Sequence, residues 1–160
     1  MIKLRNLNLE PLRTDFKSGH YSLVRRLSED KGVYEFVSKR FSEWIKPPVS
    51  ENQYEIGKGY VVTNSNQEKI GMCGSTRGSI SDGGLIDLWV AIDEGQRGKG
   101  YGEKVVVQMT EFFLDTIPKL DNITLAINKN NVASNKMAIL SGYTFDKEHD
   151  GKNYYNYFGK

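Results

Sequence analysis

The sequence contains few of the residues from which disulfide frameworks and metal centres are built. Among 160 residues there is one cysteine, Cys73, and there are two histidines, His20 and His149. A single cysteine excludes an internal disulfide and is typical of proteins in a reducing compartment, so we expect a cytoplasmic protein. Two histidines and one cysteine do not supply the ligand set of the usual zinc sites, so we expect no metal.

Long apolar runs and a strong charge of one sign are lacking too. No segment approaches the roughly 18 consecutive apolar residues of a membrane span, and the N-terminus has no apolar block of the signal-peptide kind. We therefore expect a soluble protein with no membrane partner. The net charge is +2, with Lys and Arg spread along the chain. This gives no indication of a nucleic-acid groove but is compatible with a polyanionic ligand.

Proline is scarce, and all four prolines fall where periodic segments end. Hydrophobic periodicity predicts strands near residues 4–12, 60–63, 69–75, 85–92, 123–127, 143–148 and 154–158, and helices near residues 18–27, 33–46, 100–117 and 131–140. Alternation of this kind predicts a mixed sheet covered by helices. Because the sequence has no internal repeat and no linker, we expect a single domain over residues 1–160.

Glycine is concentrated in the most informative segment, the passage from the strand at 85–92 to the long helix after it. Glycines at 98, 100 and 102 leave bare backbone against which a ligand can lie. The amides of the helix's first turn have no intrahelical acceptor, and the helix dipole adds partial positive charge there. Such a turn is suited to a phosphate or pyrophosphate, and Arg97 and Lys99 add cationic donors beside it.

The spacing of these glycines excludes two common nucleotide-binding motifs. A Walker A loop requires Lys after its last glycine, but Tyr101 follows Gly100. The dinucleotide fingerprint requires a third glycine at position 103, which is Glu103. The pattern that fits is Arg-x-x-Gly-x-Gly, at Arg97, Gly100 and Gly102.

This pattern resembles the pyrophosphate-binding motif of the Gcn5-related N-acetyltransferases (GNAT). Downstream, Asn-x-x-Ser at Asn131 and Ser134, followed by Gly142 and Tyr143, resembles the second signature of that family. The resemblance covers about residues 58–158 and is closest to the branch of ribosomal-protein N-terminal acetyltransferases. It implies an α/β (α+β) fold, the acyl-CoA N-acyltransferase fold, with a mixed, mostly antiparallel central sheet of about six to seven strands flanked by about four helices.

The resemblance also implies acetyl-CoA as the cosubstrate. Its pantetheine would lie in a gap between the fourth and fifth strands of the family and pair with strand backbone near Val90 and Ile92. The residues expected to bind the cofactor are Val90, Ile92, Arg97, Gly98, Lys99, Gly100, Tyr101, Gly102 and Asn131.

At the catalytic positions the sequence differs from the pattern that is most common in the family. Many members have a tyrosine four residues before the glycine of the second signature, where this sequence has Ala138. Ser134 is the candidate proton donor to the departing thiolate, although a serine at a helix start is also typical of a cap. Asp87 is the candidate general base, with a pKa raised by its apolar neighbours; alternatively it lies at the wet end of the sheet.

The expected function is transfer of an acetyl group from acetyl-CoA to a primary amine of a small molecule or a peptide or protein N-terminus. We expect direct attack within a ternary complex. The alternative is a non-catalytic acyl-CoA-binding module on the same fold, suggested by Ala138. A nucleotide-binding regulator is a third reading. Nucleic acid is expected as a partner only in the form of an aminoacyl-tRNA acceptor, and a homodimer is compatible with the sequence.

Overall fold

A computed structural model of the chain describes residues 1–13, 18–36, 45–77 and 84–158. Within them the strands form one eight-stranded sheet in the order β1-β2-β3-β4-β5-β6-β8-β7. The strands are β1 (Ile2–Lys3), β2 (Leu7–Pro11), β3 (Gly59–Asn64), β4 (Lys69–Arg77), β5 (Leu85–Ile92), β6 (Asn122–Asn128), β7 (Thr144–His149) and β8 (Lys152–Phe158). The helices are α1 (His20–Glu29), α2 (Lys31–Phe36), the short 3-10 helix η1 (Glu94–Gln96), α4 (Tyr101–Thr116) and α5 (Val132–Leu140).

The predicted fold class is confirmed, with one more strand than the upper expected number. The β5–β6 pair is parallel, whereas the other neighbouring strands of the sheet are antiparallel. The extra strand is β1, which precedes the segment expected as a strand near residues 4–12; that segment forms β2, and the two strands pair with each other. Part of the helix predicted at 33–46 is seen as α2, and residues 37–44 lie outside the described residues.

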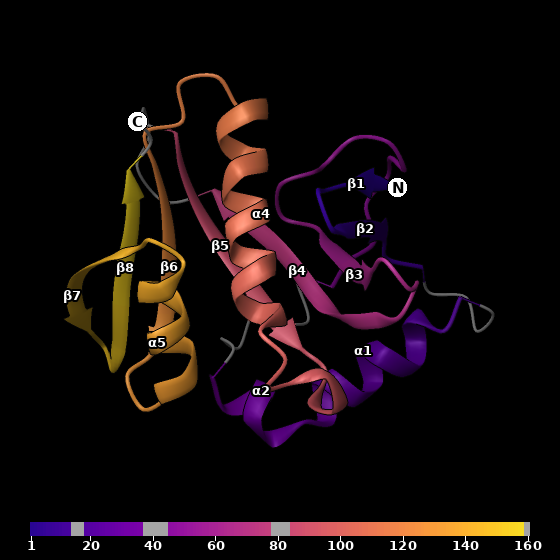
Figure 1. The fold of residues 1–160 in the computed structure, drawn as a ribbon, viewed down its shortest axis with the longest axis horizontal. Helices are drawn as coiled ribbons and strands as arrows, with labels where there is room; N and C mark the ends of the chain where they lie inside the picture. Colours follow the sequence, from indigo (N-terminus) through magenta and orange to yellow (C-terminus); the bar gives the residue numbers. More distant parts are fainter. Residues whose placement is uncertain (14–17, 37–44, 78–83, 159–160) are drawn as a thin grey trace.

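Helices cover both faces of the sheet, and each face has its own core. On one face, α4 crosses the sheet (Figure 1) and packs Val106, Met109 and Phe113 into a cluster with the β5 residues Ile86 and Leu88. On the other face, Leu23, Leu27 and Val33 from α1 and α2 pack against a second cluster that includes Trp89 and Ala91 of β5. β5 therefore lies between the two cores, with alternate side chains on opposite faces. None of the helices in the described segments has the length and apolar character needed to cross a bilayer.

The sheet opens between β5 and β6, and this opening positions the site. The register of the two strands runs from Leu85 paired with Asn122 to Asp87 paired with Thr124. β5 continues to Ile92 without β6, while β6 stays paired with β8 along its whole length. Backbone N–H and C=O groups on an open strand edge need partners, so the edge of β5 beyond Asp87 is available to an extended ligand.

Candidate active site

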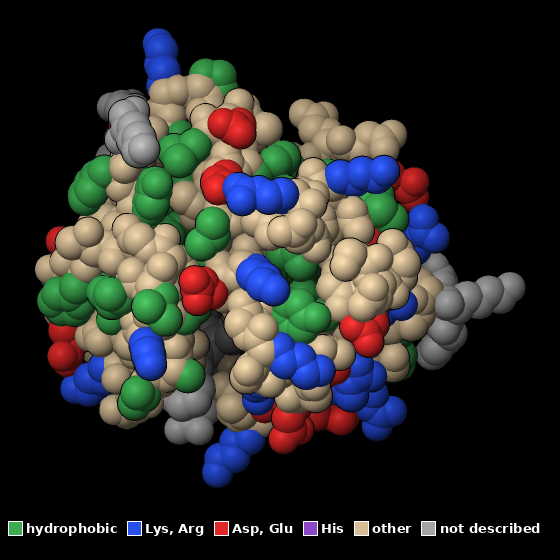
Figure 2. Space-filling model, viewed as in Figure 1, with side chains coloured by type: hydrophobic (Ala, Val, Ile, Leu, Met, Phe, Trp, Pro, Cys, Tyr) green, Lys and Arg blue, Asp and Glu red, His purple; other side chains and the backbone are tan. Residues whose placement is uncertain are grey.

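A cavity of about 470 Å³ lies at the open end of β5, where the first turns of α2, α4 and α5 meet. A hollow is visible in this region between α5 and the beginning of α4 (Figure 2). Its walls come from five parts of the chain: Gly32 and Val33 from α2; Val90, Ala91 and Ile92 from β5; Gln96, Arg97, Gly98 and Gly100 from the loop; Tyr101, Gly102 and Glu103 from α4; and Asn131, Ala133, Ser134, Lys136, Met137 and Leu140 from the start and body of α5. Every residue predicted to bind the cofactor is among them except Lys99.

The first turn of α4 presents backbone to this cavity. Gly100, the N-cap residue, and Gly98 both have φ of 75°, a left-handed conformation that residues with side chains rarely adopt. No side chain caps the helix, and a Cβ added at either glycine would meet no atom within 4 Å. The first-turn amides of this 16-residue helix are therefore without a capping side chain beside an open space, which is the geometry expected for a pyrophosphate.

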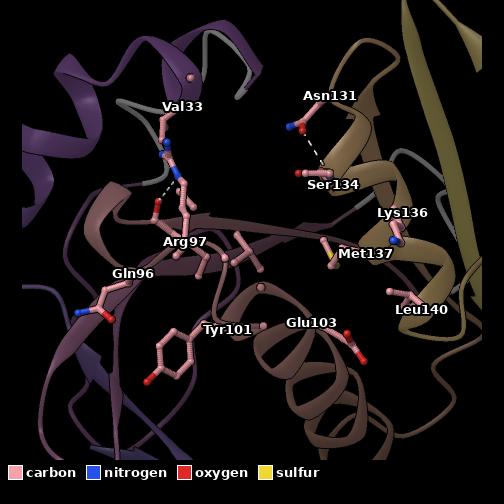
Figure 3. Close-up of a pocket in the computed structure, with 18 residues that line it drawn as sticks. Val33, Gln96, Arg97, Tyr101, Glu103, Asn131, Ser134, Lys136, Met137 and Leu140 are labelled. Atoms are coloured by element: carbon pink, nitrogen blue, oxygen red, sulfur yellow. Dashed lines mark hydrogen bonds between the residues drawn. The ribbon is translucent and has the colours of Figure 1, made fainter.

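The two predicted cations of the loop are placed differently. Arg97 lines the cavity, and its guanidinium donates from Nε to the Ile92 carbonyl at 3.0 Å and from Nη2 to Asp30 Oδ2 at 2.7 Å. Lys99 is not a lining residue, and its Nζ donates to Gln96 Oε1 at 3.1 Å. Arg97 is thus the cation that faces the cavity from this loop, and in Figure 3 it points toward Val33.

Asn131 and Ser134 lie at the start of α5, where one residue caps the helix and the other is free to donate a hydrogen bond to a ligand. Asn131 is the N-cap of α5, and its side-chain oxygen accepts a hydrogen bond from the Ser134 backbone N–H at 3.2 Å. The cap therefore comes from Asn131. The Ser134 hydroxyl has no hydrogen-bond partner among the described residues, and it extends from α5 into the cavity (Figure 3). That leaves it available to donate to a bound group.

Ala138, at the position of the family's common tyrosine, is fully buried in the core beneath α5. The wall of the cavity on this helix is formed instead by Lys136, Met137 and Leu140, which sequence reasoning did not assign to the site. The helical spacing of Ala133, Met137 and Leu140 predicts one apolar face of α5, but the pattern alone does not distinguish a core face from a ligand-facing one. Gly32 and Val33 carried no sequence signal of any kind for a role here.

Asp87 lies apart from the cavity, at the last paired position before β5 and β6 separate. Its side chain is on the face of β5 that also carries Trp89, because side chains alternate along a strand. Burial raises the pKa of the Asp87 carboxyl above its ordinary value, which is the direction expected from its apolar neighbours in the sequence. The structure therefore separates the two catalytic candidates, with Ser134 at the cavity and Asp87 at the base of the opening.

Polar groups from β6 and β8 lie next to Asp87 in the sheet. Thr124, its partner in register, donates from Oγ1 to Asn156 Oδ1 at 3.3 Å, and Asn122 Nδ2 donates to the same oxygen at 3.1 Å. The side-chain oxygen of Asn122 is buried without a hydrogen-bond partner. Together these residues form a small polar patch at the base of the opening, which no motif in the sequence predicted.

Neither a cysteine thiol nor a histidine imidazole is among the described groups that line the cavity. Cys73, the single cysteine, is fully buried in β4, and burial raises the pKa of its thiol far above the ordinary value. Among the residues that line the cavity there is neither histidine nor cysteine. Within residues 1–13, 18–36, 45–77 and 84–158, no group of three His, Cys, Asp or Glu side chains is arranged to hold a metal ion.

Solved structures with the same architecture include several acetyltransferases. An acetyltransferase of the GNAT family from Bacillus anthracis aligns with a TM-score of 0.70 and 12% identity, covering 98% of this chain and 97% of that one. The aminoglycoside acetyltransferase AAC(6')-Ib in complex with coenzyme A gives 0.68 and 16%, covering 96% and 94%. The ribosomal L7/L12 alpha-N-protein acetyltransferase RimL in complex with coenzyme A gives 0.65 and 14%, covering 96% and 94%. At these identities the likeness shows the fold.

The family itself is shown by the sequence. No curated protein matches the chain at a significant level. The family model described as an acetyltransferase (GNAT) domain matches residues 6–144, which is most of the chain. The predictions of the family and of an acetyltransferase are therefore confirmed. The chain belongs to the GNAT acetyltransferase family.

Proposed function

We propose that this protein transfers the acetyl group of acetyl-CoA to a primary amine, of a small molecule or a peptide N-terminus, by direct attack in a ternary complex. The observation that carries the proposal is the cavity at the opening between β5 and β6, which joins an uncapped helix N-terminus to a free strand edge. One end of this site suits a pyrophosphate and the other suits an amide-containing chain.

The described residues fit acetyl-CoA along the length of the cavity. The pyrophosphate would accept hydrogen bonds from the first-turn amides of α4, with Arg97 beside it. The pantetheine amides would pair with the open edge of β5 near Val90 and Ile92. Strand backbone near the thioester can then polarise its carbonyl in the manner of an oxyanion hole.

Direct attack is supported by the lack of a suitable nucleophile among the described residues. An acetyl-enzyme would need an exposed, activated side chain, such as a thiolate. Cys73 is buried and its pKa is raised, and no histidine lines the cavity to activate Ser134 as a nucleophile. The amine itself therefore attacks the thioester carbon, so that both substrates must be bound at once.

Ser134 is proposed as the group that stabilises the departing thiolate. The amine nitrogen forms a bond to the carbonyl carbon, the carbon–sulfur bond breaks, and the sulfur takes up one proton. The free hydroxyl of Ser134, directed into the cavity from α5, can donate to that sulfur. The incoming ammonium loses two protons overall, of which one ends on the thiol of CoA and one is released.

Asp87 is proposed to receive the acceptor at the base of the opening. It lies three residues before Val90, about 10 Å along the strand, and on the α1–α2 side of β5. A carboxylate beside the Thr124–Asn156 patch can bind an ammonium group and take its proton before attack. This arrangement brings the amine toward the thioester from the side opposite α4.

The acceptor class is proposed from chemistry that both kinds of structurally similar enzyme share. The aminoglycoside acetyltransferase has been solved with coenzyme A and kanamycin, and the other similar enzyme is named for a ribosomal protein N-terminus. Both acceptors present a primary amine. We therefore propose a primary amine, and the acidic side chain of Asp87 is consistent with a cationic acceptor.

The proposal is tested by initial-velocity measurements with acetyl-CoA and a panel of amines that includes kanamycin, polyamines and peptides with free N-termini. Free CoA thiol is measured over background hydrolysis. We expect turnover with at least one amine and intersecting double-reciprocal lines, which a ternary complex requires. Parallel lines, or an acetylated enzyme in intact-mass spectra, would contradict direct attack. Binding of acetyl-CoA without turnover across the panel would favour the non-catalytic acyl-CoA-binding module instead.

A further inference from the structure

Two ion pairs join the corner between α1 and α2 to the loop that leaves β5. Arg26 donates from Nε to Asp93 Oδ1 at 3.3 Å and from Nη2 to Asp93 Oδ2 at 3.0 Å. Arg97 donates from Nη2 to Asp30 Oδ2 at 2.7 Å. The arrangement is reciprocal, because each segment supplies one arginine and one aspartate placed four residues apart.

The two pairs differ in their relation to the acetyl-CoA cavity. Arg97 lines the cavity, whereas neither Arg26 nor Asp93 does. Gly32 and Val33, which follow Asp30, also line it. The Arg97–Asp30 pair therefore reaches the wall of the cavity through Arg97, and the Arg26–Asp93 pair links the same two segments at a position outside it.

Asp30 is itself held firmly by the first turn of α2. Its Oδ1 accepts hydrogen bonds from the backbone N–H groups of Gly32 at 2.8 Å and Val33 at 3.3 Å, which leaves Oδ2 for Arg97. Burial by itself would raise the pKa of the Asp30 carboxyl, but the bonds from Arg97 and these two amides lower it below the ordinary value. The carboxylate is therefore charged at neutral pH and fixed in direction.

This carboxylate fixes the guanidinium of Arg97 in turn. Nε is bound to the Ile92 carbonyl and Nη2 to Asp30, so one edge of the planar group is occupied. The remaining guanidinium N–H groups are not used by these two bonds. An arginine fixed in this way has already lost the rotamer freedom that a free arginine would lose on binding a phosphate.

We infer that Asp30 is a positioning residue for acetyl-CoA binding, which acts by holding the Arg97 guanidinium at the cavity. The α1–α2 corner, rather than the glycine loop alone, thereby sets the affinity for the cosubstrate. The inference rests on the proposed placement of the pyrophosphate beside Arg97 at the N-terminus of α4.

The substitution Asp30→Asn breaks this contact with little other change. Asparagine has the same shape, and its side-chain oxygen keeps the bonds to Gly32 and Val33. Its amide nitrogen then faces Arg97, so that a donor opposes a donor. Asp93→Asn is the matched control, since it disrupts the ion pair between the same two segments outside the cavity. If Asp30→Asn lowers the melting temperature strongly, Asp30→Ser replaces it, because serine also caps a helix.

Acetyl-CoA affinity is measured by isothermal titration calorimetry for the wild type, Asp30→Asn, Arg97→Gln, the double variant and Asp93→Asn. We expect Arg97→Gln to weaken binding about tenfold and Asp30→Asn about fivefold, as for a lost charge-assisted hydrogen bond. In the Arg97→Gln background, Asp30→Asn should add less than about twofold, because its effect passes through Arg97. Asp93→Asn should stay within about twofold of the wild type, since the side chain of Asp93 binds Arg26, which does not line the cavity.

Independent, additive losses from the two substitutions would overturn the inference and make Asp30 a structural residue only. Unchanged or tighter binding by Asp30→Asn, or equal losses from Asp93→Asn, would overturn it as well. Normal binding by Arg97→Gln would remove the inference but leave the proposed function intact, because the α4 amides would remain as the binding site. A wild-type protein that does not bind acetyl-CoA would instead refute the proposed function, and this inference with it.

Discussion

The two sides of β5 present sites of different construction. On the cosubstrate side, the site is made from backbone, chiefly a single loop and the first turn of α4, where glycines at 98, 100 and 102 expose amides and open space. The proposed acceptor site is made instead from side chains of three strands, Asp87 in β5, Thr124 in β6 and Asn156 in β8. A backbone site depends on the absence of side chains, whereas a side-chain site depends on their chemistry.

This difference predicts how each site responds to substitution. At the cosubstrate side, adding volume should be more harmful than changing charge, because the recognising groups are amides that every residue type except proline retains. At the acceptor side, a substitution that keeps the volume and changes the chemistry should be sufficient to reduce the activity.

The largest effect is expected from Gly102→Val. A Cβ at this position would lie 3.9 Å from Ile92 Cγ1 and 4.0 Å from Met137 Cγ, which are ordinary contacts, so the fold accommodates it. The two further methyl groups would occupy space in the cavity that the cosubstrate needs. We expect acetyl-CoA to bind about 100-fold more weakly by calorimetry, with no loss of melting temperature because valine has no lower helix propensity than glycine.

Gly95→Val is the control for this substitution. A Cβ at Gly95 would meet no atom within 4 Å, and the residue does not line the cavity. Its affinity for acetyl-CoA should equal that of the wild type. Wild-type affinity in Gly102→Val would show that the cosubstrate does not lie against the first turn of α4, and the contrast between the two sides of β5 would be lost.

Removing the hydroxyl of Ser134 should have the next largest effect. Ser134→Ala keeps the backbone N–H that donates to the Asn131 side-chain oxygen, so α5 retains its cap. A hydrogen bond to a thiolate is worth about 1.5–3 kcal/mol, and kcat should therefore fall about 30-fold while the affinity for acetyl-CoA stays unchanged. Ser141→Ala is the control, since its hydroxyl contacts the Met137 sulfur at the other end of α5. An unchanged kcat in Ser134→Ala would exclude the serine as proton donor.

The contrast between the sites also explains what the sequence could predict. Glycines spaced along one loop are contiguous in sequence, so the cosubstrate site was expected at Gly98, Gly100 and Gly102, and these residues do line the cavity. The strand at 85–92 was predicted with the bounds that β5 has, because it is an apolar run, interrupted only by Asp87, that is entered from a glycine turn.

The remaining parts of the site depend on contacts between distant segments, which a local pattern does not carry. The α1–α2 corner lines the cavity through Gly32 and Val33, and it is joined to the loop by Asp30, which binds Arg97 across 67 positions of the chain. The polar patch at Asp87 needs Asn156, whose place beside β6 is set by strand order and register. The divergence of β5 from β6 is likewise a property of pairing, and the sequence indicated it only through the resemblance to the family.

The smallest effect is expected at Asp87, and its sign depends on pH. Burial raises the pKa of this carboxyl in the folded state, so the folded protein holds the proton more tightly than the unfolded chain does. The stability that Asp87 contributes is therefore present at low pH and is lost as the pH rises through its folded pKa. Asp87→Asn does not ionise, so its melting temperature should exceed that of the wild type at pH 8 and approach it at pH 4.

If Asp87 binds the acceptor, kcat/KM for the amine should nevertheless fall about tenfold at pH 8. Asp121→Asn, which changes an exposed carboxyl just before β6, should alter neither quantity. A more stable but fully active Asp87→Asn would identify Asp87 as a residue buried without a catalytic role, and the acceptor side would have to be sought elsewhere on the sheet.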